Sequence, residues 1–149
     1  MAHGYSFKSK DREIDFYSFM EAEVMKPKAD MALISICSPG VRFNIPYDKW
    51  PNSLILEFDD TGEDDSEWDD ANVFFSEKHA KELIEFVQKL PETTKFIAVH
   101  CTQGVSRSGA VVKFLTKHVF PDCYNAKFDR VYTYHNDLVY RILEKEWKK

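Results

Sequence analysis

Apolar residues along this chain fall into compact runs that are closed by polar or turn residues. Three continuous runs predict strands: MALISIC at 31–37, SLILEF at 53–58 and FIAV at 96–99. The last of them is typical of a strand buried on both faces of a parallel sheet. A fourth stretch, EIDFYSFMEAEVM at 13–25, alternates at first and then changes period. This pattern predicts a strand followed by a short capped helical turn that ends at Pro27.

Two of these runs are followed by apolar residues at helical spacing. Ser76 is a candidate N-cap for a helix that ends at Pro91 and carries one apolar stripe, made of Ala80, Leu83, Ile84, Val87 and Leu90. A second helix is predicted from Ser108, with an apolar pattern that stops before Pro121. Residues 121–134 are predicted to form a loop, and a last helix is expected around 138–143.

Strands that alternate with helices predict an α/β fold with a central, mostly parallel sheet and helices on both of its faces. The elements at 53–58, 76–90 and 96–99 form a strand–helix–strand crossover, which joins parallel strands. A chain of 149 residues is expected to fold as one domain, 1–149, around a single core. The polar residues 1–12 are expected to be flexible.

Composition narrows the class of protein. The chain is 44% hydrophobic and 30% charged, with a net charge of −5, as in globular proteins that lack a basic nucleic-acid-binding face or an attraction to anionic membranes. No apolar run approaches a membrane span, and the first 15 residues lack the apolar core of a secretion signal. We therefore expect a cytoplasmic monomer without nucleic-acid or membrane partners.

The chemistry is concentrated in HCTQGVSRSG at 100–109, between the last apolar run and the helix after it. Gly104 permits a tight turn, and a loop that closes onto a helix start points several backbone N–H groups at one spot, which binds an anion. That field favours the thiolate of Cys101, the nucleophilic form. Arg107 can hold two phosphate oxygens at once, so this loop is predicted to be a phosphate cradle with a nucleophile at its floor.

The spacing of Cys101, Arg107 and Ser108 resembles the C-x5-R-[ST] signature loop of cysteine-dependent protein tyrosine phosphatases, and the ten-residue string is most similar to the dual-specificity branch. The order of elements resembles that family from about residue 30 onward. Individual residues match the family only in this loop. The resemblance implies the dual-specificity phosphatase fold and a phosphocysteine intermediate on Cys101. It also implies that the phosphate group of the substrate is held by the loop residues Thr102, Gln103, Gly104, Val105, Ser106 and Arg107. Free inorganic phosphate or sulfate is expected to bind in the same place.

By the same resemblance, Ser108 hydrogen-bonds the cysteine sulfur and His100 orders the loop, and the reaction needs no metal or other cofactor. The family also uses an aspartate as general acid, just past the strand before the crossover helix. Asp60 is our choice, because the FDD turn holds it at the carboxyl edge of the sheet. Asp69 or Asp70 fits the spacing to Cys101 better, unless an acidic insertion follows Asp60.

The expected substrate is a phosphoprotein or phosphopeptide, with phosphotyrosine first and phosphoserine or phosphothreonine next. Loop residues 102–106 lack the lysine that lipid phosphatases of this superfamily carry, and the nearby carboxylates are expected to disfavour acidic peptides. The alternatives are a weakly catalytic phosphate- or phosphopeptide-binding module of the same fold, or a phosphatase for a non-protein phosphate. A cysteine arsenate reductase is disfavoured because that class tends to carry its loop near the N-terminus.

Other chemistry-bearing residues have plainer interpretations. Eight of the twelve residues from Asp59 to Asp70 are acidic, and this run is expected to be a solvated loop rather than a metal site. Cys37 and Cys123 are expected to pack as inert thiols, with a protective disulfide to Cys101 as the alternative. We expect His3, His79, His118 and His135 at the surface or at helix caps. We expect Tyr47, Trp50 and Trp68 to pack in the core or at its rim, or to form the wall of a cleft.

Overall fold

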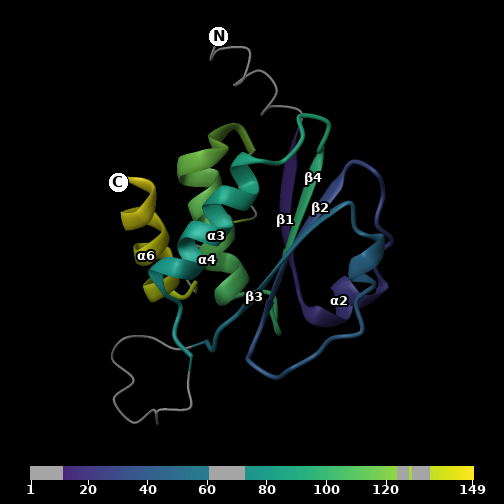
Figure 1. The fold of residues 1–149 in the computed structure, drawn as a ribbon, viewed down its shortest axis with the longest axis horizontal. Helices are drawn as coiled ribbons and strands as arrows, with labels where there is room; N and C mark the ends of the chain where they lie inside the picture. Colours follow the sequence, from purple (N-terminus) through teal and green to yellow (C-terminus); the bar gives the residue numbers. More distant parts are fainter. Residues whose placement is uncertain (1–11, 61–72, 124–127, 129–134) are drawn as a thin grey trace.

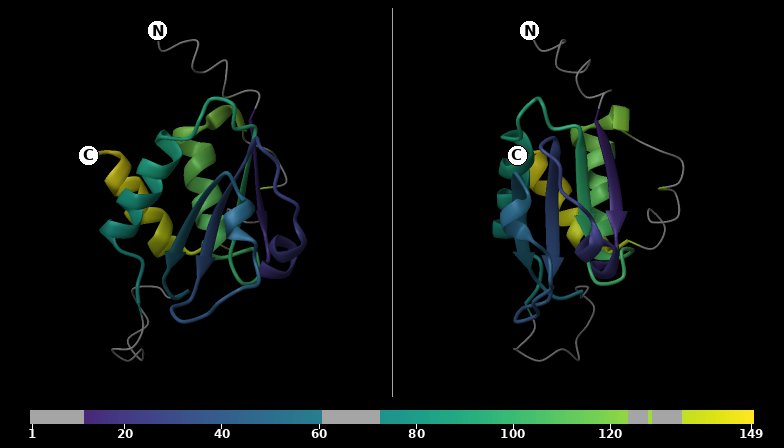
Figure 2. Two further views of the ribbon diagram at one scale, coloured as in Figure 1. Left: turned by 45° about the vertical axis from the view of Figure 1, so that its right-hand side comes forward. Right: turned by 90° about the vertical axis from the view of Figure 1, so that its right-hand side faces the viewer.

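A computed structural model describes residues 12–60, 73–123, 128 and 135–149 of the chain. The described chain is an α/β structure with a four-stranded sheet between two helical layers (Figure 1). Helices α3 (Glu77–Gln88), α4 (Arg107–Phe114) and α6 (Asp137–Trp147) cover one face. The short helix α2 (Phe19–Val24) and a 3₁₀ turn at Tyr47–Lys49 lie on the other face, so the predicted coverage of both faces is confirmed (Figure 2).

The strands are β1 (Glu13–Tyr17), β2 (Met31–Cys37), β3 (Asn52–Glu57) and β4 (Phe96–His100), and all their pairings are parallel. Their order in the sheet is β1-β4-β2-β3. The predicted crossover through α3 therefore joins parallel strands that are not neighbours, because β2 lies between β3 and β4. In this register His100 is opposite both Tyr17 and Ser35, so the carboxyl ends of three strands meet at one edge of the sheet.

The main core fills the space between the sheet and α3, α4 and α6, and its most buried side chains are aromatic and aliphatic, including Phe58, Phe114, Leu83, Ile97 and Leu143. A smaller cluster lies on the opposite face around Trp50, with Ala22, Leu33, Ile45 and Ala98. Trp50 is therefore a core residue, as its packing interpretation predicted. Both faces of the central strands β2 and β4 are buried, which is why their sequences are continuous apolar runs.

Several local predictions can be compared with the structure. Ser18 caps α2 through a capping box with Glu21, which confirms the strand followed by a capped helical turn. Helix α3 does begin after Ser76, but it ends at Gln88 rather than at Pro91. The predicted helix from Ser108 starts one residue earlier and runs into a π-helical turn at Leu115–Val119, before a 3₁₀ turn at Pro121–Cys123. Most of the predicted 121–134 loop lies outside the described residues.

Arg12 is the first described residue; the flexibility expected for residues 1–12 stays a prediction, because residues 1–11 lie outside the described part. The Arg12 guanidinium donates to the carbonyl oxygens of Thr94 at 2.9 Å and Pro91 at 3.2 Å, and lies 4.9 Å from the Phe120 ring centroid. A cation over an aromatic face adds stabilisation to these hydrogen bonds. Arg12 thus anchors the start of β1 to the chain before β4.

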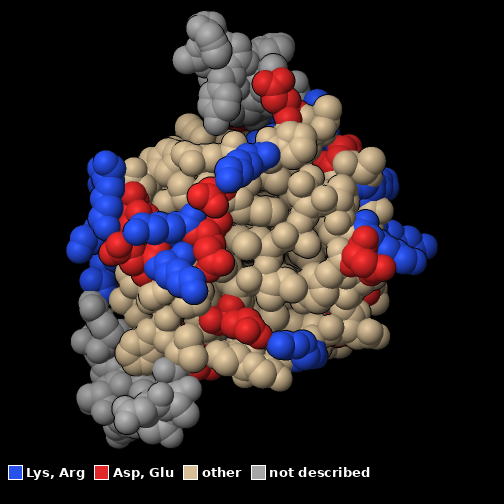
Figure 3. All heavy atoms as spheres, viewed as in Figure 1, with Lys and Arg blue, Asp and Glu red and all other residues tan. Residues whose placement is uncertain are grey.

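Two surface features complete the fold. In the view of Figure 3, Lys, Arg, Asp and Glu side chains gather over α3 and α6, where Glu77 pairs with both Lys81 and Lys149 at 3.3 Å. Exposed pairs of this kind contribute little stability, and the two signs are mixed rather than separated into one basic face. Within the described ranges, no helix is both long enough and apolar enough to cross a membrane.

Candidate active site

The loop between β4 and α4 wraps around the thiol of Cys101. The Gly104 N–H donates to Cys101 Sγ at 3.3 Å, and Ser108 Oγ lies 3.2 Å from the same sulfur. Cys101 and Ser108 are buried, while Thr102 and Gln103 are exposed and Val105 and Ser106 are half-buried. Because α4 begins at Arg107, the positive end of its dipole faces the loop. A donor N–H, a hydroxyl and the start of a helix are therefore gathered around the sulfur.

Gly104 is required here for two reasons. Its φ is +76°, a conformation that L side chains rarely adopt. A Cβ at this position would lie 2.6 Å from the Tyr17 carbonyl carbon and 2.7 Å from the Ser18 nitrogen. The loop therefore lies directly against the backbone where β1 passes into α2.

Hydrogen bonds hold the loop against that junction. The Cys101 N–H donates to the Tyr17 carbonyl at 3.3 Å, and the Phe19 N–H donates to the Thr102 carbonyl at 3.2 Å. The ambiguous stretch 13–25 thus supports the conformation of the loop. Sequence reasoning missed this role, since the only local signal was the Ser18 cap.

Arg107 is buried beneath the loop, with 4% of its surface exposed. Its Nη1 donates to the Phe58 carbonyl at 2.8 Å and to Ser38 Oγ at 3.1 Å, and its Nη2 donates to Thr102 Oγ1 at 2.9 Å. Among the described residues, Arg107 Nε is buried without an acceptor. A buried charged donor in that condition favours an anion beside it, so the residues fit a bound phosphate.

Asp60 reaches the same loop from the end of β3. Its Oδ1 accepts hydrogen bonds from Ser106 Oγ at 2.8 Å and from Asn136 Nδ2 at 2.7 Å. Both of these bonds end on Oδ1, so within the described part of the chain Oδ2 is the oxygen left for a proton or a substrate. The rival aspartates Asp69 and Asp70, like Trp68 and His3, lie outside the described residues.

Two hydrogen bonds join Asp59 to Val73. The Asp59 N–H donates to the Val73 carbonyl at 2.7 Å, and the Val73 N–H donates to Asp59 Oδ2 at 2.8 Å. These two bonds hold Asp59, the residue next to Asp60, in place.

Asn136 is a site residue that sequence reasoning missed. Besides its bond to Asp60, its backbone N–H donates to the Ser106 carbonyl at 3.0 Å, and its Oδ1 caps α6 by accepting from Val139 N at 3.2 Å. It therefore ties the start of α6 to both the loop and the aspartate. An Asn before an apolar helix is a cap signal, but nothing in the sequence connects it to residues 60 and 106.

His100 is fully buried behind the loop. Its Nδ1 lies 3.2 Å from the Cys101 carbonyl oxygen and its Nε2 lies 2.6 Å from Ser35 Oγ. Burial lowers the pKa of His100, and the positive charge of Arg107 acts in the same direction. The imidazole is therefore neutral at pH 7 and serves as a fixed hydrogen-bonding group.

The other cysteines do not approach Cys101. Cys37 follows Ile36 on β2 and faces the side of the sheet opposite the core that contains Cys101, and all three cysteines are free. Cys123 donates to the Arg12 carbonyl at 3.1 Å, at the amino end of β1, and burial raises its pKa to about 11. The alternative of a disulfide to Cys101 has no support from this geometry.

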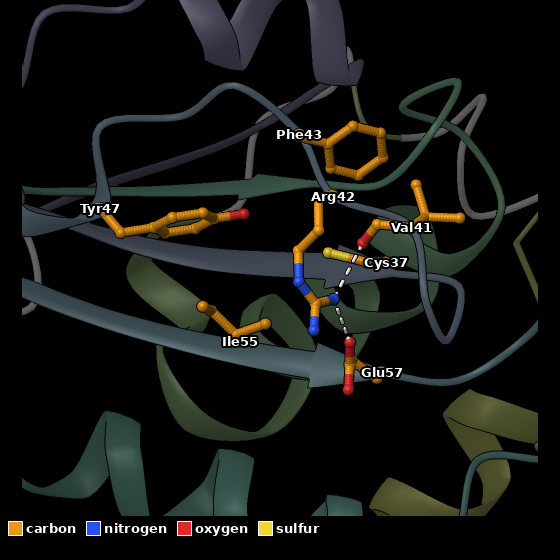
Figure 4. A pocket seen from close by; sticks show the side chains of 7 residues that line it. All are labelled: Cys37, Val41, Arg42, Phe43, Tyr47, Ile55 and Glu57. Carbon is orange, nitrogen blue, oxygen red and sulfur yellow. Dashed lines mark hydrogen bonds and ion pairs between the residues drawn. The ribbon is translucent and has the colours of Figure 1, made fainter.

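A pocket of about 360 Å³ lies at the carboxyl ends of β2 and β3, and Figure 4 shows Arg42 reaching across it to Glu57. Arg42 Nη1 donates to Glu57 Oε2 at 2.7 Å. The remaining lining residues are Cys37, Val41, Phe43, Tyr47 and Ile55, so Tyr47 does line a cavity.

Among the described histidines, His79 agrees with the capping interpretation, whereas His118 and His135 are half-buried rather than exposed at the surface. The Ser76 N–H donates to His79 Nδ1 at 3.0 Å at the start of α3, and His79 Nε2 donates to the Glu57 carbonyl at 3.0 Å. His118 is instead part-buried, with Nε2 3.0 Å from Glu144 Oε2. In the described ranges, no group of three or more His, Cys, Asp or Glu side chains has a metal-binding arrangement.

No protein-family model matches this chain, and no curated protein matches it either.

Proposed function

We propose that this protein is a cysteine-dependent phosphatase that hydrolyses phosphomonoesters through a phosphocysteine on Cys101. The observation that carries the proposal is one loop in which the Gly104 N–H donates to the Cys101 sulfur and the buried Arg107 guanidinium, at the start of α4, donates to Thr102 Oγ1. Such a group binds a phosphoryl dianion and presents a nucleophile to its phosphorus. The resemblance of HCTQGVSRSG to the signature loop of dual-specificity phosphatases points to the same chemistry.

In the first step, the Cys101 thiolate attacks phosphorus in line with the leaving oxygen. The S–P bond forms as the P–O bond of the ester breaks, and loop N–H groups with Arg107 stabilise the charge on the other phosphate oxygens. The leaving oxygen takes a proton from Asp60. With Ser106 and Asn136 both donating to Oδ1, the acid proton resides on Asp60 Oδ2.

In the second step, the Asp60 carboxylate takes a proton from water, and the resulting oxygen attacks phosphorus. The S–P bond breaks, inorganic phosphate leaves and the thiolate returns. Ser108 Oγ, 3.2 Å from Cys101 Sγ, donates a hydrogen bond to the departing sulfur and stabilises its charge. The assignment of Asp60 is the part of this mechanism with the nearest rivals, Asp69 and Asp70.

Phosphotyrosine in proteins is the substrate that we favour. The stacked rings of Phe19 and Phe43, 4.9 Å apart, lie beside the loop, since the Phe19 N–H is bonded to the Thr102 carbonyl. Apolar aromatic surface next to a phosphate cradle favours an aryl ester. The absence of lysine from residues 102–106 disfavours polyanionic lipid headgroups.

The test is hydrolysis of para-nitrophenyl phosphate and of a phosphotyrosine peptide by the wild type, Cys101→Ser and Cys123→Ser. Cys123→Ser is the matched control, because it makes the same chemical change at a buried thiol at the other end of β1. We expect activity in the wild type and the control, and loss of at least about a thousandfold in Cys101→Ser. If phosphopeptide binds but none of the three proteins hydrolyses it, the binding-module alternative is favoured.

A further inference from the structure

Strand β3 forms one margin of the sheet, with β2 as its neighbour on the inner side (Figure 2). The Phe58 N–H, directly after the strand, donates to the Cys37 carbonyl of β2 at 3.0 Å. In a parallel ladder every second residue bonds to the neighbouring strand, and the residues between point their backbone groups the other way. Ser53, Ile55 and Glu57 therefore direct their N–H and C=O groups outward, away from the sheet.

One contact agrees with this direction and marks the end of the open edge. His79 Nε2, at the start of α3, donates to the Glu57 carbonyl at 3.0 Å. Within the described ranges, the Ser53 and Ile55 backbone groups and the Glu57 N–H make no hydrogen bond outside the sheet. The open edge of β3 thus extends from Ser53 to Glu57.

The opposite margin of the sheet is covered by the protein's own groups. On β1, the Phe16 N–H donates to the Asp15 carboxylate at 2.9 Å, and the Arg12 carbonyl just before the strand accepts from Cys123 Sγ at 3.1 Å. The Phe128 ring lies 5.8 Å from the ring of Phe16. Proteins usually block or cover sheet edges, because a bare edge pairs with other chains.

Strand β3 lacks these protections in the part of the chain that the structure describes. Its sequence, NSLILE, contains no lysine and no proline. Its register with β2 is unbroken from Asn52 to Glu57, so no bulge turns the edge away. The Ile55 side chain is 48% exposed. A regular, apolar and uncovered edge is suited to pairing with a further strand.

A pocket lies on each face of this edge. The pocket on the α3 face has a volume of about 290 Å³, and its lining includes Leu54, Phe86, Leu90, Glu82, Glu85 and Lys89. Lys89 and Glu85 form an ion pair at 3.7 Å, whereas Glu82 forms none with the described residues. The pocket therefore combines apolar walls with one unbalanced negative charge. It fits the aliphatic stem and the cationic head of a lysine or an arginine.

The pocket on the α2 face fits an apolar side chain. It is the cavity of about 360 Å³ in Figure 4, where Ile55 and Glu57 of β3 lie below Arg42. Arg42 and Glu57, 2.7 Å apart, balance each other's charge, and Val41 and Ile55 are partly exposed. Because Leu54 and Ile55 are adjacent, the two pockets receive neighbouring residues of a strand that lies along β3.

We propose that the open edge of β3 is a docking site for an extended peptide segment of a partner protein, in which apolar and basic residues alternate. The segment adds to the sheet as a further strand, through backbone hydrogen bonds to Ser53, Ile55 and Glu57. Its apolar side chains enter the pocket at Ile55, and its basic side chains enter the pocket at Glu82. The inference does not depend on the proposed phosphatase activity, because it uses none of the residues assigned to that reaction.

Charge favours such a segment over a second copy of this chain. Antiparallel pairing of two copies through β3 would bring both Glu82 carboxylates to the same face of the joined sheet, and each chain carries a net charge of −5. Like charges that face each other across paired strands are destabilising. A basic segment is instead attracted to Glu82.

The experiment measures the fluorescence anisotropy of labelled hexapeptides with the full chain. One peptide alternates valine and lysine. A second has the same composition in two blocks, with the valines before the lysines. A third is the alternating peptide with N-methylated backbone amides, which cannot pair with a strand.

Two variants test the two pockets. Glu82→Gln removes the unbalanced charge, and its matched control is Glu77→Gln, which makes the same change on the same helix outside both pockets. Ile55→Thr reduces the apolar surface and keeps a β-branched residue in the strand. Its matched control is Val24→Thr, at a 77% exposed position on α2.

We expect the alternating peptide to bind with a dissociation constant below about 100 µM. The block peptide and the N-methylated peptide should bind at least about tenfold more weakly, because they lose the backbone ladder or the alternation. Glu82→Gln should weaken binding about threefold, and Ile55→Thr about fivefold. The two control variants should bind as the wild type does. The bound peptide should also slow amide hydrogen exchange at Ile55 and Glu57, measured by nuclear magnetic resonance.

Several results would overturn the inference. Equal affinity for the alternating, block and N-methylated peptides would mean that binding is by charge alone. Equal losses in Glu82→Gln and Glu77→Gln would mean that the peptide binds elsewhere on α3. Absence of binding by the alternating peptide would exclude the docking site, and a dimer in sedimentation experiments that Ile55→Thr disrupts would make a second copy the occupant. Glu82 lies at the surface of α3, so the test does not depend on the folding of Ile55→Thr.

Discussion

Gly104→Ala is the perturbation for which the structure supplies both a magnitude and a matched control. The new Cβ would lie 2.6 Å from Tyr17 C, 2.7 Å from Ser18 N and 2.8 Å from Tyr17 O. All three are backbone atoms and cannot rotate away. The junction of β1 and α2 must move, together with the hydrogen bonds from Cys101 N to the Tyr17 carbonyl and from Phe19 N to the Thr102 carbonyl.

Two costs add at this position. A left-handed φ costs an L residue about 1–2 kcal/mol, and forced displacement of packed backbone costs about 1–3 kcal/mol more. Gly40 has a similar φ of +82°, but a Cβ there would meet no atom within 4 Å. Gly40→Ala therefore carries the conformational cost alone. The difference between the two variants measures the contact of the loop with β1.

Urea unfolding at pH 7 should show a loss of about 2–5 kcal/mol for Gly104→Ala and about 1–2 kcal/mol for Gly40→Ala. Hydrolysis of para-nitrophenyl phosphate should fall at least about tenfold in Gly104→Ala, since the Gly104 N–H that donates to Cys101 Sγ is displaced. It should stay near the wild-type rate in Gly40→Ala. Equal destabilisation of the two variants, or full activity in Gly104→Ala, would refute the argument that the loop is held by this contact.

Four further predictions concern the site. Arg107→Lys should lower kcat/KM about a hundredfold in steady-state kinetics, because an ammonium cannot keep three hydrogen bonds to Ser38, Phe58 and Thr102 and also bind phosphate in two places; a loss below about threefold would contradict this role. Asp60→Asn should abolish the fall of kcat at alkaline pH; if the variant retains that fall, the acid is another aspartate. Asn136→Ala, which leaves Asp60 unchanged but removes its hydrogen-bond donor, should lower kcat. Burial lowers the pKa of His100 below its usual 6.5, so the unfolded chain binds more protons than the folded chain as the pH falls through 6.5. The free energy of unfolding should therefore decrease between pH 7.5 and pH 5.5, and it should decrease less in His100→Gln. Equal slopes of the unfolding free energy against pH, measured by urea titration, would exclude His100 as the cause.

Local pattern predicted the elements of this fold well, and for identifiable reasons. Strands β2 and β4 are buried on both faces, so their sequences are unbroken apolar runs that need no tertiary information to find. Ser18 and Ser76 cap their helices through residues three positions away, and that interaction is also local. The α/β class with a parallel sheet follows from the alternation of these elements. The order β1-β4-β2-β3 does not, because strand neighbours depend on how helices pack across the whole sheet.

The same division holds within the candidate site. Cys101, Gly104, Arg107 and Ser108 are neighbours in sequence, so one loop and one helix start place them together, and their spacing alone predicts an anion-binding nucleophile. Asp60 was chosen from its position at a strand end, and its contact with Ser106 spans 46 residues. The choice between Asp60 and Asp69 or Asp70 as the acid stays a prediction.

The sequence by itself determined the loop that we propose as an anion cradle, because a strand, a tight turn at Gly104 and a helix that starts at Arg107 are local events with local signals. Only the tertiary structure decided what surrounds the cradle. Asn136 reaches Asp60 across 76 residues and Ser35 reaches His100 across 65. Tyr17 supports the loop only through backbone atoms. Contacts of this kind depend on the packing of whole strands and helices, and a serine, an asparagine or a main-chain carbonyl has the same appearance in the sequence whether or not such a partner exists.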